Sequence, residues 1–572
     1  MTPALAAALC ILSYGLAYRF YGRFLVRRVF HLDESRETPA HTLRDGVDYV
    51  PSRPIVLFGH HYASITGLAP MLGPAVAVIW GWGPALLWVV LGAIFVGCVH
   101  DFAALVVSMR AKGLSVGKVA EGVIGPRART LFHCIIFFGV SLAMGVFVFV
   151  IAKLFSIELA PGRPGYPQAV LPSGILMVVA MIAGFLLYRK GFPLFWVIVV
   201  GFVIELGAIG LGLEFPTCGL TPEQWPASFS WTFILLAYAF VASVLPVWAL
   251  LQSRDFLNSL LLYLGLGLAY IGLFVGAPAF DAPAFVPEPE GAPPIFPFVF
   301  IVIACGAASG FHGLVSSGTT AKQLNNELDA QPIAYGGMIG ESLLGLLAVL
   351  ACTAGFGTAE GWHEHYASWQ TAQGLATKID VFIQGATSFI TNLGVSESLA
   401  SALIAMVVVS FALTTLDSAT RLLRFNIEEM GTTAGLSFVK NRYISSLLAC
   451  ASIAFFALYK VDGKAAALAL WQLFGTTNQL LAGLTLILAS IYLKRRGWPV
   501  WPTALPALFM LLSTFGAMGA NLIRFASGPG ADTLLLVVGG ILLLLGVWLV
   551  VESVIVLKKL QKVEGVEIAV DT

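Results

Sequence analysis

The chain has 572 residues, of which 58% are hydrophobic and 11% are charged, and its formal net charge is +1. Soluble proteins are about 45–50% apolar and about 25% charged. The composition therefore excludes a soluble enzyme and a disordered regulator, and the neutral balance leaves no basic surface for nucleic acid. A helix needs about 20 apolar residues to cross a bilayer, and more than half of the chain can be placed in such stretches. The sequence predicts an all-α, polytopic transmembrane helical bundle.

About fifteen apolar stretches are predicted to span the membrane. Lys and Arg concentrate in cytoplasmic loops, and here Arg19, Arg23, Arg27 and Arg28 follow the first span. With strict alternation, all but six of the 32 Lys and Arg fall on that same side. This asymmetry predicts an N-terminus outside the cell and a C-terminus in the cytoplasm. In chain order the predicted spans lie near residues 4–24, 55–80, 84–108, 131–155, 170–188, 193–213, 229–252, 256–276, 296–318, 335–357, 399–416, 441–459, 465–492, 499–521 and 533–556.

Residues 375–393 differ from the predicted spans. Apolar residues recur there at helical spacing, with Lys378 and Asp380 between them. This pattern predicts an amphipathic helix that lies on the outer membrane surface. No loop is long enough to form a soluble domain, so we interpret residues 1–572 as a single integral-membrane domain.

Two apolar segments, 58–74 and 303–322, contain helix breakers at membrane depth. Backbone polar groups in lipid must be hydrogen-bonded, so interrupted spans point to a buried or cavity-lining site. The two spans run in opposite directions, as inverted repeats do, although six spans separate them where a plain five-plus-five repeat has four. The alternative is close helix packing through small residues. The breakers are Gly67, Pro70, Gly73 and Pro74 in the first segment and Gly306, Gly310, Gly313 and Gly318 in the second.

A broken helix offers a half-helix N-terminus, which carries partial positive charge and free N–H groups. A carboxylate is a natural ligand for such an end, and nearby hydroxyl groups can add hydrogen bonds. The sequence therefore predicts a small anionic or zwitterionic organic substrate. The candidate substrate-binding residues are Gly59, His60, His61, Ser64, Ser309, Gly310, His312, Ser316, Ser317, Thr319 and Thr320.

Ionisable residues inside spans are costly in lipid, and this makes them candidates for proton coupling. Each has a structural alternative. His60 and His61 can form a hydrogen-bonded pair, and Asp417 can form an i,i+4 ion pair with Arg421. His100 and Asp101 are expected to need separate partners, because adjacent residues on a helix do not face each other. The candidates for proton coupling are His60, His61, His100, Asp101, Glu341 and Asp417.

The coupling ion is left open by these residues. Unwound carbonyls and hydroxyls near the second span are also suited to Na⁺. No cofactor and no metal site is predicted, because the cluster His363-Glu364-His365 in an outer loop lacks a visible third ligand.

Several motifs together resemble the carbon starvation protein A family, and the resemblance covers nearly the whole chain. The longest is DGVDYVPSRPIVLFGHHYASITGLAPMLGP. One departure is Ser253-Arg254-Asp255, in a predicted loop, where the family pattern has Pro-Arg-Asp. The matching segments are 45–74, 100–102, 243–259, 296–320, 414–421 and 471–486.

The resemblance implies a secondary transporter of the bacterial inner membrane with a fold like the amino acid–polyamine–organocation superfamily. Its expected partners are the bilayer, a peptide or pyruvate as substrate, and a coupling ion, H⁺ or Na⁺; its expected role is nutrient uptake during carbon starvation. A membrane nutrient sensor that signals through a partner is the alternative, against which stands the lack of a cytoplasmic output domain. An enzyme is not expected, since no catalytic motif is visible.

Overall fold

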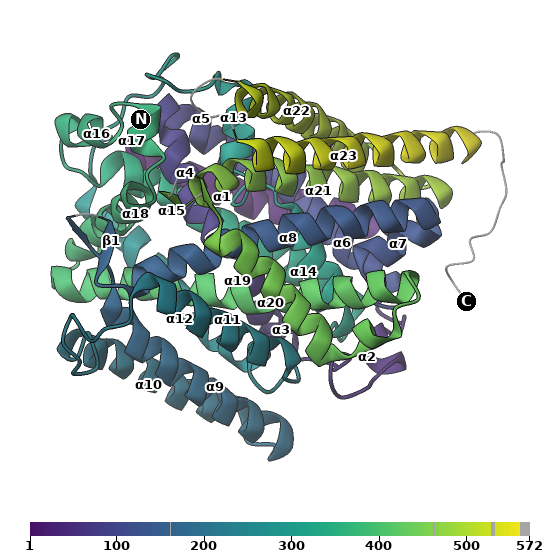
Figure 1. Cartoon of the computed structure of the whole chain (residues 1–572), viewed down its shortest axis with the longest axis horizontal. Helices are drawn as coiled ribbons and strands as arrows, with labels where there is room; N and C mark the ends of the chain where they lie inside the picture. Colours follow the sequence, from purple (N-terminus) through teal and green to yellow (C-terminus); the bar gives the residue numbers. More distant parts are fainter. Residues whose placement is uncertain (161, 462–463, 466, 528–531, 561–572) are drawn as a thin grey trace.

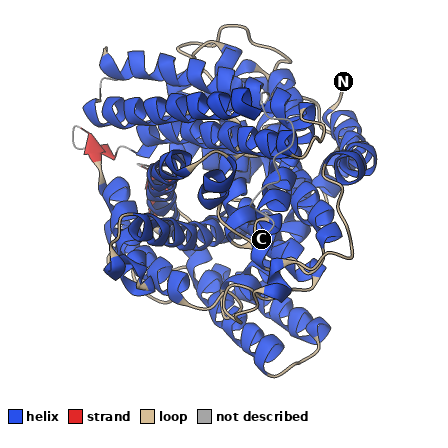
Figure 2. Ribbon diagram, turned by 90° about the vertical axis from the view of Figure 1, so that its right-hand side faces the viewer, coloured by secondary structure: helices blue, strands red, loops and turns tan. Residues whose placement is uncertain are grey.

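The computed structural model describes residues 1–160, 162–461, 464–465, 467–527 and 532–560. Most of this is helix, and two short antiparallel hairpins, β1–β2 and β3–β4, lie in loops (Figures 1 and 2). The strands are β1 Glu158–Ala160, β2 Arg163–Pro164, β3 Lys460–Val461 and β4 Lys464–Ala465. The α-helices of the first half are α1 Pro3–Leu16, α2 Pro39–Thr42, α3 Pro54–Ile65, α4 Ala69–Ala77, α5 Trp82–Leu87, α6 Cys98–Arg110, α7 Val116–Val123, α8 Pro126–Phe155, α9 Val170–Arg189, α10 Leu194–Glu214, α11 Ser228–Val244 and α12 Leu251–Gly276.

The second half of the chain continues the bundle. Its α-helices are α13 Ile295–Val302, α14 Gly310–Gly318, α15 Gly336–Ala354, α16 Ala359–His365, α17 Trp369–Ala372, α18 Leu375–Thr391, α19 Glu397–Thr433, α20 Arg442–Leu458, α21 Ala467–Arg495, α22 Trp501–Ala526 and α23 Thr533–Leu560. In Figure 1 the chain begins at the left end of the bundle and α23 ends at the right. The first described helix thus begins, and the last one ends, at opposite ends of this view; an odd number of membrane crossings stays a prediction.

Among the described residues, eleven helices are long and apolar enough to cross a membrane, or twelve when the bent pair Pro54–Ile65 and Ala69–Trp80 counts as one span. About fifteen were predicted. The other three predicted spans fall on helical segments that are shorter or interrupted: α11, α20, and the pair α13 and α14. Hydropathy detects each apolar stretch, but it does not show where a helix stops within that stretch.

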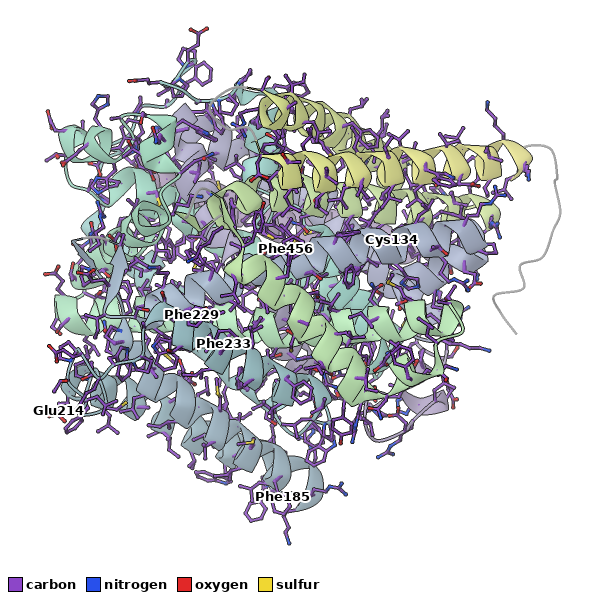
Figure 3. The ribbon with its side chains drawn as sticks, viewed as in Figure 1. Cys134, Phe185, Glu214, Phe229, Phe233 and Phe456 are labelled. Carbon is purple, nitrogen blue, oxygen red and sulfur yellow. The ribbon has the colours of Figure 1, made fainter. Side chains whose placement is uncertain are left out.

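The helices differ in what they bury. The most apolar stretch of the α21 span is 94% buried, whereas the corresponding stretches of the α9 and α23 spans are only 33% buried. Large apolar side chains project outward from the peripheral helices, including Phe185, Phe229 and Phe233 (Figure 3). An apolar exterior of this kind suits contact with lipid, and it leaves the polar core of the bundle as the place for a site.

The two predicted breaks are present and lie side by side. The helix axis bends by 47° between α3 and α4, and residues 303–309 separate α13 from α14. Helix α3 contacts α14, and α4 contacts α13. The first half of each broken helix thus packs against the second half of the other. The two broken helices therefore run antiparallel, as the sequence predicts. An inverted repeat of the whole bundle stays a prediction.

Helix α18 forms within the segment 375–393 that was predicted to be amphipathic, but it does not lie on the outside of the bundle. It packs among α4, α12, α15 and α19, and Lys378 and Asp380 on it are buried. Asp380 is paired with Arg163, 2.6 Å from its guanidinium. Gln384 on the same helix is exposed, and the position of α18 at a membrane surface stays a prediction.

Close packing of the two breaks depends on small residues. A Cβ added at Gly73 would lie 2.5 Å from the carbonyl oxygen of Val302 in the other broken helix. We therefore expect Gly73→Ala to destabilise the fold by about 1–3 kcal/mol, the usual cost of overpacking. Thermal unfolding in detergent measures the change. Gly174→Ala on α9, where a Cβ meets nothing within 4 Å, is the control and should unfold at or above the wild-type temperature.

Candidate functional site

The residues singled out from the sequence are all buried in the centre of the bundle, around the two breaks. They come from α3, α6, α14, α15, α19 and the residues on either side of α14. The structure sorts most of the ionisable ones into two groups. We name these the α14 cluster and the α12 cluster.

The α14 cluster consists of His100, Asp101, Cys305, His312 and Glu341. His312 Nδ1 lies 2.9 Å from Asp101 Oδ2, and His312 Nε2 lies 3.1 Å from Glu341 Oε2. The other Asp101 oxygen lies 2.8 Å from His100 Nδ1. The expectation that His100 and Asp101 would need separate partners is therefore wrong for His100. Its imidazole reaches the carboxylate of the next residue on the same helix.

The α12 cluster consists of His60, Tyr238, Arg254, Asp255 and Asp417, with Ser64 at its edge. Asp255 Oδ2 lies 2.7 Å from His60 Nδ1 and accepts a 3.1 Å hydrogen bond from the Ser64 hydroxyl. Arg254 donates to Asp255, at 3.1 Å, and also to Asp417. The Tyr238 hydroxyl donates a 2.5 Å hydrogen bond to Asp417. A continuous chain of charged and polar groups thus links α3, α11, α12 and α19.

The suggested i,i+4 pair of Asp417 and Arg421 does not form. Arg421 instead donates to the carbonyl oxygens of Ala242 and Leu245, and its guanidinium lies 3.4 Å from Asp48. Asp417 is paired across the bundle with Arg254. The guanidinium of Arg254 lies between two carboxylates, those of Asp255 and Asp417. Arg421, one turn along the helix from Asp417, does not reach that position.

His61 lies outside both clusters. Its Nδ1 is 2.9 Å from the Thr320 hydroxyl, and its Nε2 has no hydrogen-bond partner among the described residues. Gly337 on α15 leaves room for the ring, because a Cβ there would lie 2.9 Å from His61 Cδ2. His60 and His61 therefore do not pair with each other: each ring is held by a different helix.

The N-terminus of α14 is already occupied in part. The backbone N–H of Phe311 donates a 2.9 Å hydrogen bond to Asn478 Oδ1, and Ser309 also contacts this amide, at 3.0 Å from its nitrogen. The neighbouring Gln479 donates to the carbonyl oxygens of Phe300 and Ala304. These two amides of α21 satisfy backbone groups that the break exposes, so a substrate carboxylate would have to compete for the Phe311 N–H.

The remaining predicted residues have mixed surroundings. Gly310 and Gly59 serve close packing, against the α21 backbone and against Phe256 on α12. Ser317 accepts a hydrogen bond from the Val116 N–H, and Thr319 bonds its own helix. The Ser316 hydroxyl is buried with no hydrogen-bond partner among the described residues.

Two cavities flank the broken helix α13–α14 at its opposite ends. One, of about 110 Å³, reaches the C-terminal end of α14 and is lined by residues that include Ser317, Lys322, Glu428 and Glu429. The other, of about 40 Å³, reaches the end of α13 and is lined by residues that include Val302, Trp369, Lys378, Trp471 and Arg524. Cys305 and His312 of the α14 cluster belong to the part of the chain between these two ends.

The sequence is similar to those of known proteins. A profile described as carbon starvation protein CstA matches residues 3–360 and 363–517. The chain belongs to the CstA family. It is 34% identical over 522 residues to "Peptide transporter CstA" of Bacillus subtilis (strain 168), covering 85% of this chain and 84% of that relative. It is 31% identical over 592 residues to "Pyruvate/proton symporter BtsT" of Escherichia coli (strain K12), covering 90% and 81%.

A solved structure shows a more distant likeness. The crystal structure of MhsT in complex with L-phenylalanine matches with 14% sequence identity and a TM-score of 0.43, over 83% of this chain and 98% of that one.

Sequence reasoning missed three members of the α12 cluster in this CstA-family chain: Tyr238, Arg254 and Asp255. The adjacent charges of Arg254 and Asp255 were visible, but they were assigned to a loop. Helix α12 begins at Leu251 and places both in its first turns, fully buried. Two opposite charges at the edge of an apolar run were the available signal, because such residues are rarely buried unless paired.

The α12 cluster predicts an asymmetry between two variants. Arg254→Met leaves Asp255 and Asp417 without their shared cation, and breaking a buried pair costs about 3–5 kcal/mol. Asp417→Asn leaves Arg254 paired with Asp255, so its cost should be smaller. Thermal unfolding in detergent, with both variants at matched yield, tests this order. Equal losses of stability would contradict the shared-cation arrangement.

Proposed function

We propose that this protein is a secondary transporter that imports a small carboxylate, pyruvate or a short peptide, across the bacterial inner membrane together with protons. Two relatives, named as a peptide transporter and a pyruvate/proton symporter, suggest the substrate classes. In this proposal the N-terminus faces the periplasm and the C-terminus faces the cytoplasm, as the distribution of Lys and Arg predicts.

The observation that carries proton coupling is the charge balance of the α12 cluster. Arg254 contributes one positive charge and Asp255 and Asp417 one negative charge each, so the buried group is at −1 when His60 is neutral. One added proton brings it to zero. Because net charge is costly away from water, this cluster is suited to hold a proton while it is closed off from both sides.

Symport of an anion with a proton follows the same logic. A monocarboxylate and a proton together carry no net charge, so their joint passage avoids leaving a charge in the apolar interior. A peptide brings an amino group as well, and the remaining carboxylates, Asp101 and Glu341, are candidates to receive it. Their predicted roles in proton coupling, with that of His100, stay predictions.

In this proposal, the segment that precedes α3 closes the cytoplasmic end of the substrate pathway. Asp48 pairs with Arg421, and the Lys322 ammonium lies 5.4 Å from the centre of the Tyr49 ring. Ser52 accepts a 2.7 Å hydrogen bond from Gln252 on α12. These contacts hold the segment against α12, α19 and the residues that follow α14. The segment would therefore have to move for the substrate to be released into the cytoplasm.

A Na⁺-coupled carrier is the second candidate, and one observation favours it. The break between α3 and α4 brings Gly67 against the Thr415 hydroxyl, and the hydroxyls of Thr66 and Thr415 are buried without hydrogen-bond partners among the described residues. Hydroxyls and unwound carbonyls are ligands suited to Na⁺.

Uptake into proteoliposomes tests the proposal. We expect labelled pyruvate or a labelled dipeptide to accumulate when a proton gradient is directed inward and not when it is collapsed. His60→Gln should abolish gradient-driven accumulation, since the α12 cluster loses its titratable ring, and His61→Gln should reduce it. His365→Gln, in a helix outside the bundle core, is the control and should behave as wild type. Accumulation driven only by a Na⁺ gradient would support the second candidate instead.

Lys378 gives a test at the cavity that reaches the end of α13. Burial on α18 lowers the pKa of this lysine to about 7, so its ammonium is present below that pH and is lost as the pH rises through it. A charge-assisted hydrogen bond is worth about 1.5–3 kcal/mol, and we expect the affinity for the anionic substrate to fall about tenfold or more across this pH range.

Equilibrium binding to the purified protein measures this affinity without a gradient. Lys378→Arg retains its charge throughout and should bind equally at both ends of the range, whereas Lys378→Gln should bind weakly at both. A wild-type affinity that does not change with pH would exclude Lys378 as a substrate contact.

A further inference from the structure

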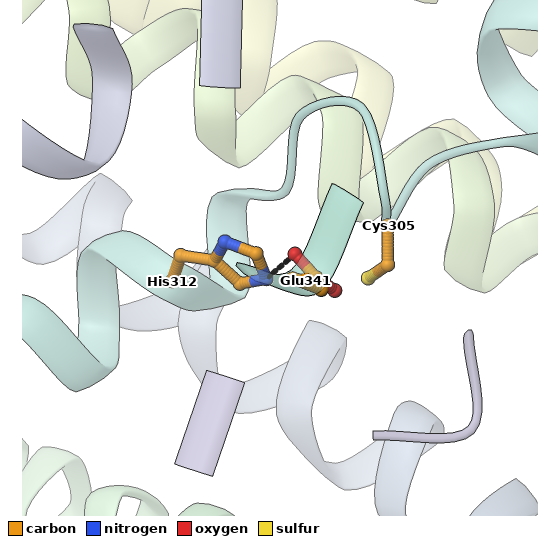
Figure 4. Close-up of side chains that lie close together, drawn as sticks. All are labelled: Cys305, His312 and Glu341. Carbon is orange, nitrogen blue, oxygen red and sulfur yellow. Dashed lines mark ion pairs between the residues drawn. The ribbon is translucent and has the colours of Figure 1, made fainter. Parts of the chain in front are cut away.

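Three side chains of the α14 cluster have the composition of a transition-metal site. Cys305, His312 and Glu341 come from the break, from α14 and from α15, and one ligand atom of each lies within 4.8 Å of the other two (Figure 4). All three are buried. A thiolate, an imidazole and a carboxylate are the three ligand types that bind Zn²⁺ in proteins.

Two of the three side chains, His312 and Glu341, have ligand atoms that approach each other at 3.1 Å and make no hydrogen bond to other described residues. The third, the Cys305 thiol, donates to the Ser309 hydroxyl at 3.2 Å and accepts from the Asn478 amide nitrogen at 3.7 Å, and it would exchange these contacts for the ion. Neither carboxylate oxygen of Glu341 accepts a hydrogen bond of good geometry from the described residues, and His312 Nε2 likewise has none. Both side chains are completely buried. Buried polar atoms without partners are rare, and an ion is one of the few explanations for several of them at one point.

The surroundings orient the histidine as a ligand. Asp101 Oδ2 lies 2.9 Å from His312 Nδ1, which fixes the proton on Nδ1 and leaves Nε2 with its lone pair toward Glu341 and Cys305. A carboxylate behind a metal-binding histidine is the common second-shell arrangement of zinc sites. Asp101 is itself held by His100, 2.8 Å away.

We propose that Cys305, His312 and Glu341 bind one divalent transition-metal ion, of which Zn²⁺ fits the ligand set best. Zinc ligands lie about 2.0–2.3 Å from the ion, which puts the ligand atoms of a tetrahedral site about 3.4 Å apart. His312 Nε2 and Glu341 Oε2 already have that spacing, at 3.1 Å. Closure around an ion requires an inward shift of the Cys305 thiol, which lies on the irregular segment between α13 and α14.

Such an ion would tie the break to α15. Three protein ligands leave the fourth tetrahedral position for water or another oxygen ligand. The ion also balances charge: the Cys305 thiolate and the Glu341 carboxylate together neutralise Zn²⁺, so His312 stays neutral. The metal site is tested separately from transport, because metal content is measured without substrate or a gradient; an occupied site would remove Glu341 from the candidates for proton coupling and for the amino group of a peptide.

Metal analysis of the full-length protein tests the site. The protein is purified in detergent, stripped with a chelator, exposed to Zn²⁺, and desalted before its metal content is measured by mass spectrometry. We expect about one Zn²⁺ per chain. Cys305→Ser and Glu341→Gln should retain less than a tenth of that amount, whereas Cys352→Ser, a buried cysteine on α15 outside the cluster, should retain it fully.

Cobalt gives a second readout that identifies the ligands. Co²⁺ bound to the wild type should show a thiolate-to-cobalt charge-transfer band in the near ultraviolet, absent in Cys305→Ser and present in Cys352→Ser. Asp101→Asn should keep the band but weaken the affinity by about 10–100-fold, as loss of a second-shell partner does. Size-exclusion elution shows that each variant is folded. A wild type that binds no stoichiometric metal, or a band that persists in folded Cys305→Ser, would overturn the proposal.

Discussion

The arrangement of the bundle core depends on the burial of charge at the centre of an apolar protein. Asp255 lies against His60, Ser64 and Arg254, and through Arg254 it is joined to Asp417. A buried carboxylate without such partners would be strongly destabilising. The helices that supply the partners, α3, α12 and α19, are therefore held at fixed positions around it, and the break after α3 falls next to this group.

The breaks are also destabilising, because they leave buried backbone N–H and C=O groups without helical hydrogen bonds. Helix α21 supplies partners for several of these groups near α14. Its two amides, Asn478 and Gln479, hydrogen-bond backbone groups on both sides of residues 303–309. Glycines let the opposing backbones approach. The result is a pair of antiparallel broken helices whose interior is polar but enclosed, which is the arrangement expected where an ion and a small substrate pass together.

Local patterns in the sequence predicted the helices and the breaks, because hydropathy and Gly/Pro placement act within a few residues. They did not predict partners. Asp417 has an arginine four residues ahead, yet its partner Arg254 lies 163 positions away. Helix α18 has the periodicity of an interfacial helix, but periodicity does not tell whether lipid or protein covers the apolar face.

The same limit explains which site residues were found. Histidines and acids inside apolar runs stand out, so His60, Asp101, His312 and Glu341 were recognised individually. That His312 lies between the two acids, and that Cys305 joins them, follows from tertiary packing of α6, α14 and α15. No spacing in the sequence encodes that meeting.

The most direct test of the account is whether substrate and proton move together, and whether the proton depends on the α12 cluster. Proteoliposomes that contain a trapped pH-sensitive dye would report the internal pH when pyruvate is added outside. The account predicts internal acidification with the wild type, in proportion to the pyruvate taken up, and none with Asp255→Asn in liposomes that hold the same amount of folded protein. Pyruvate entry without acidification in the wild type, or unchanged acidification with Asp255→Asn, would contradict it.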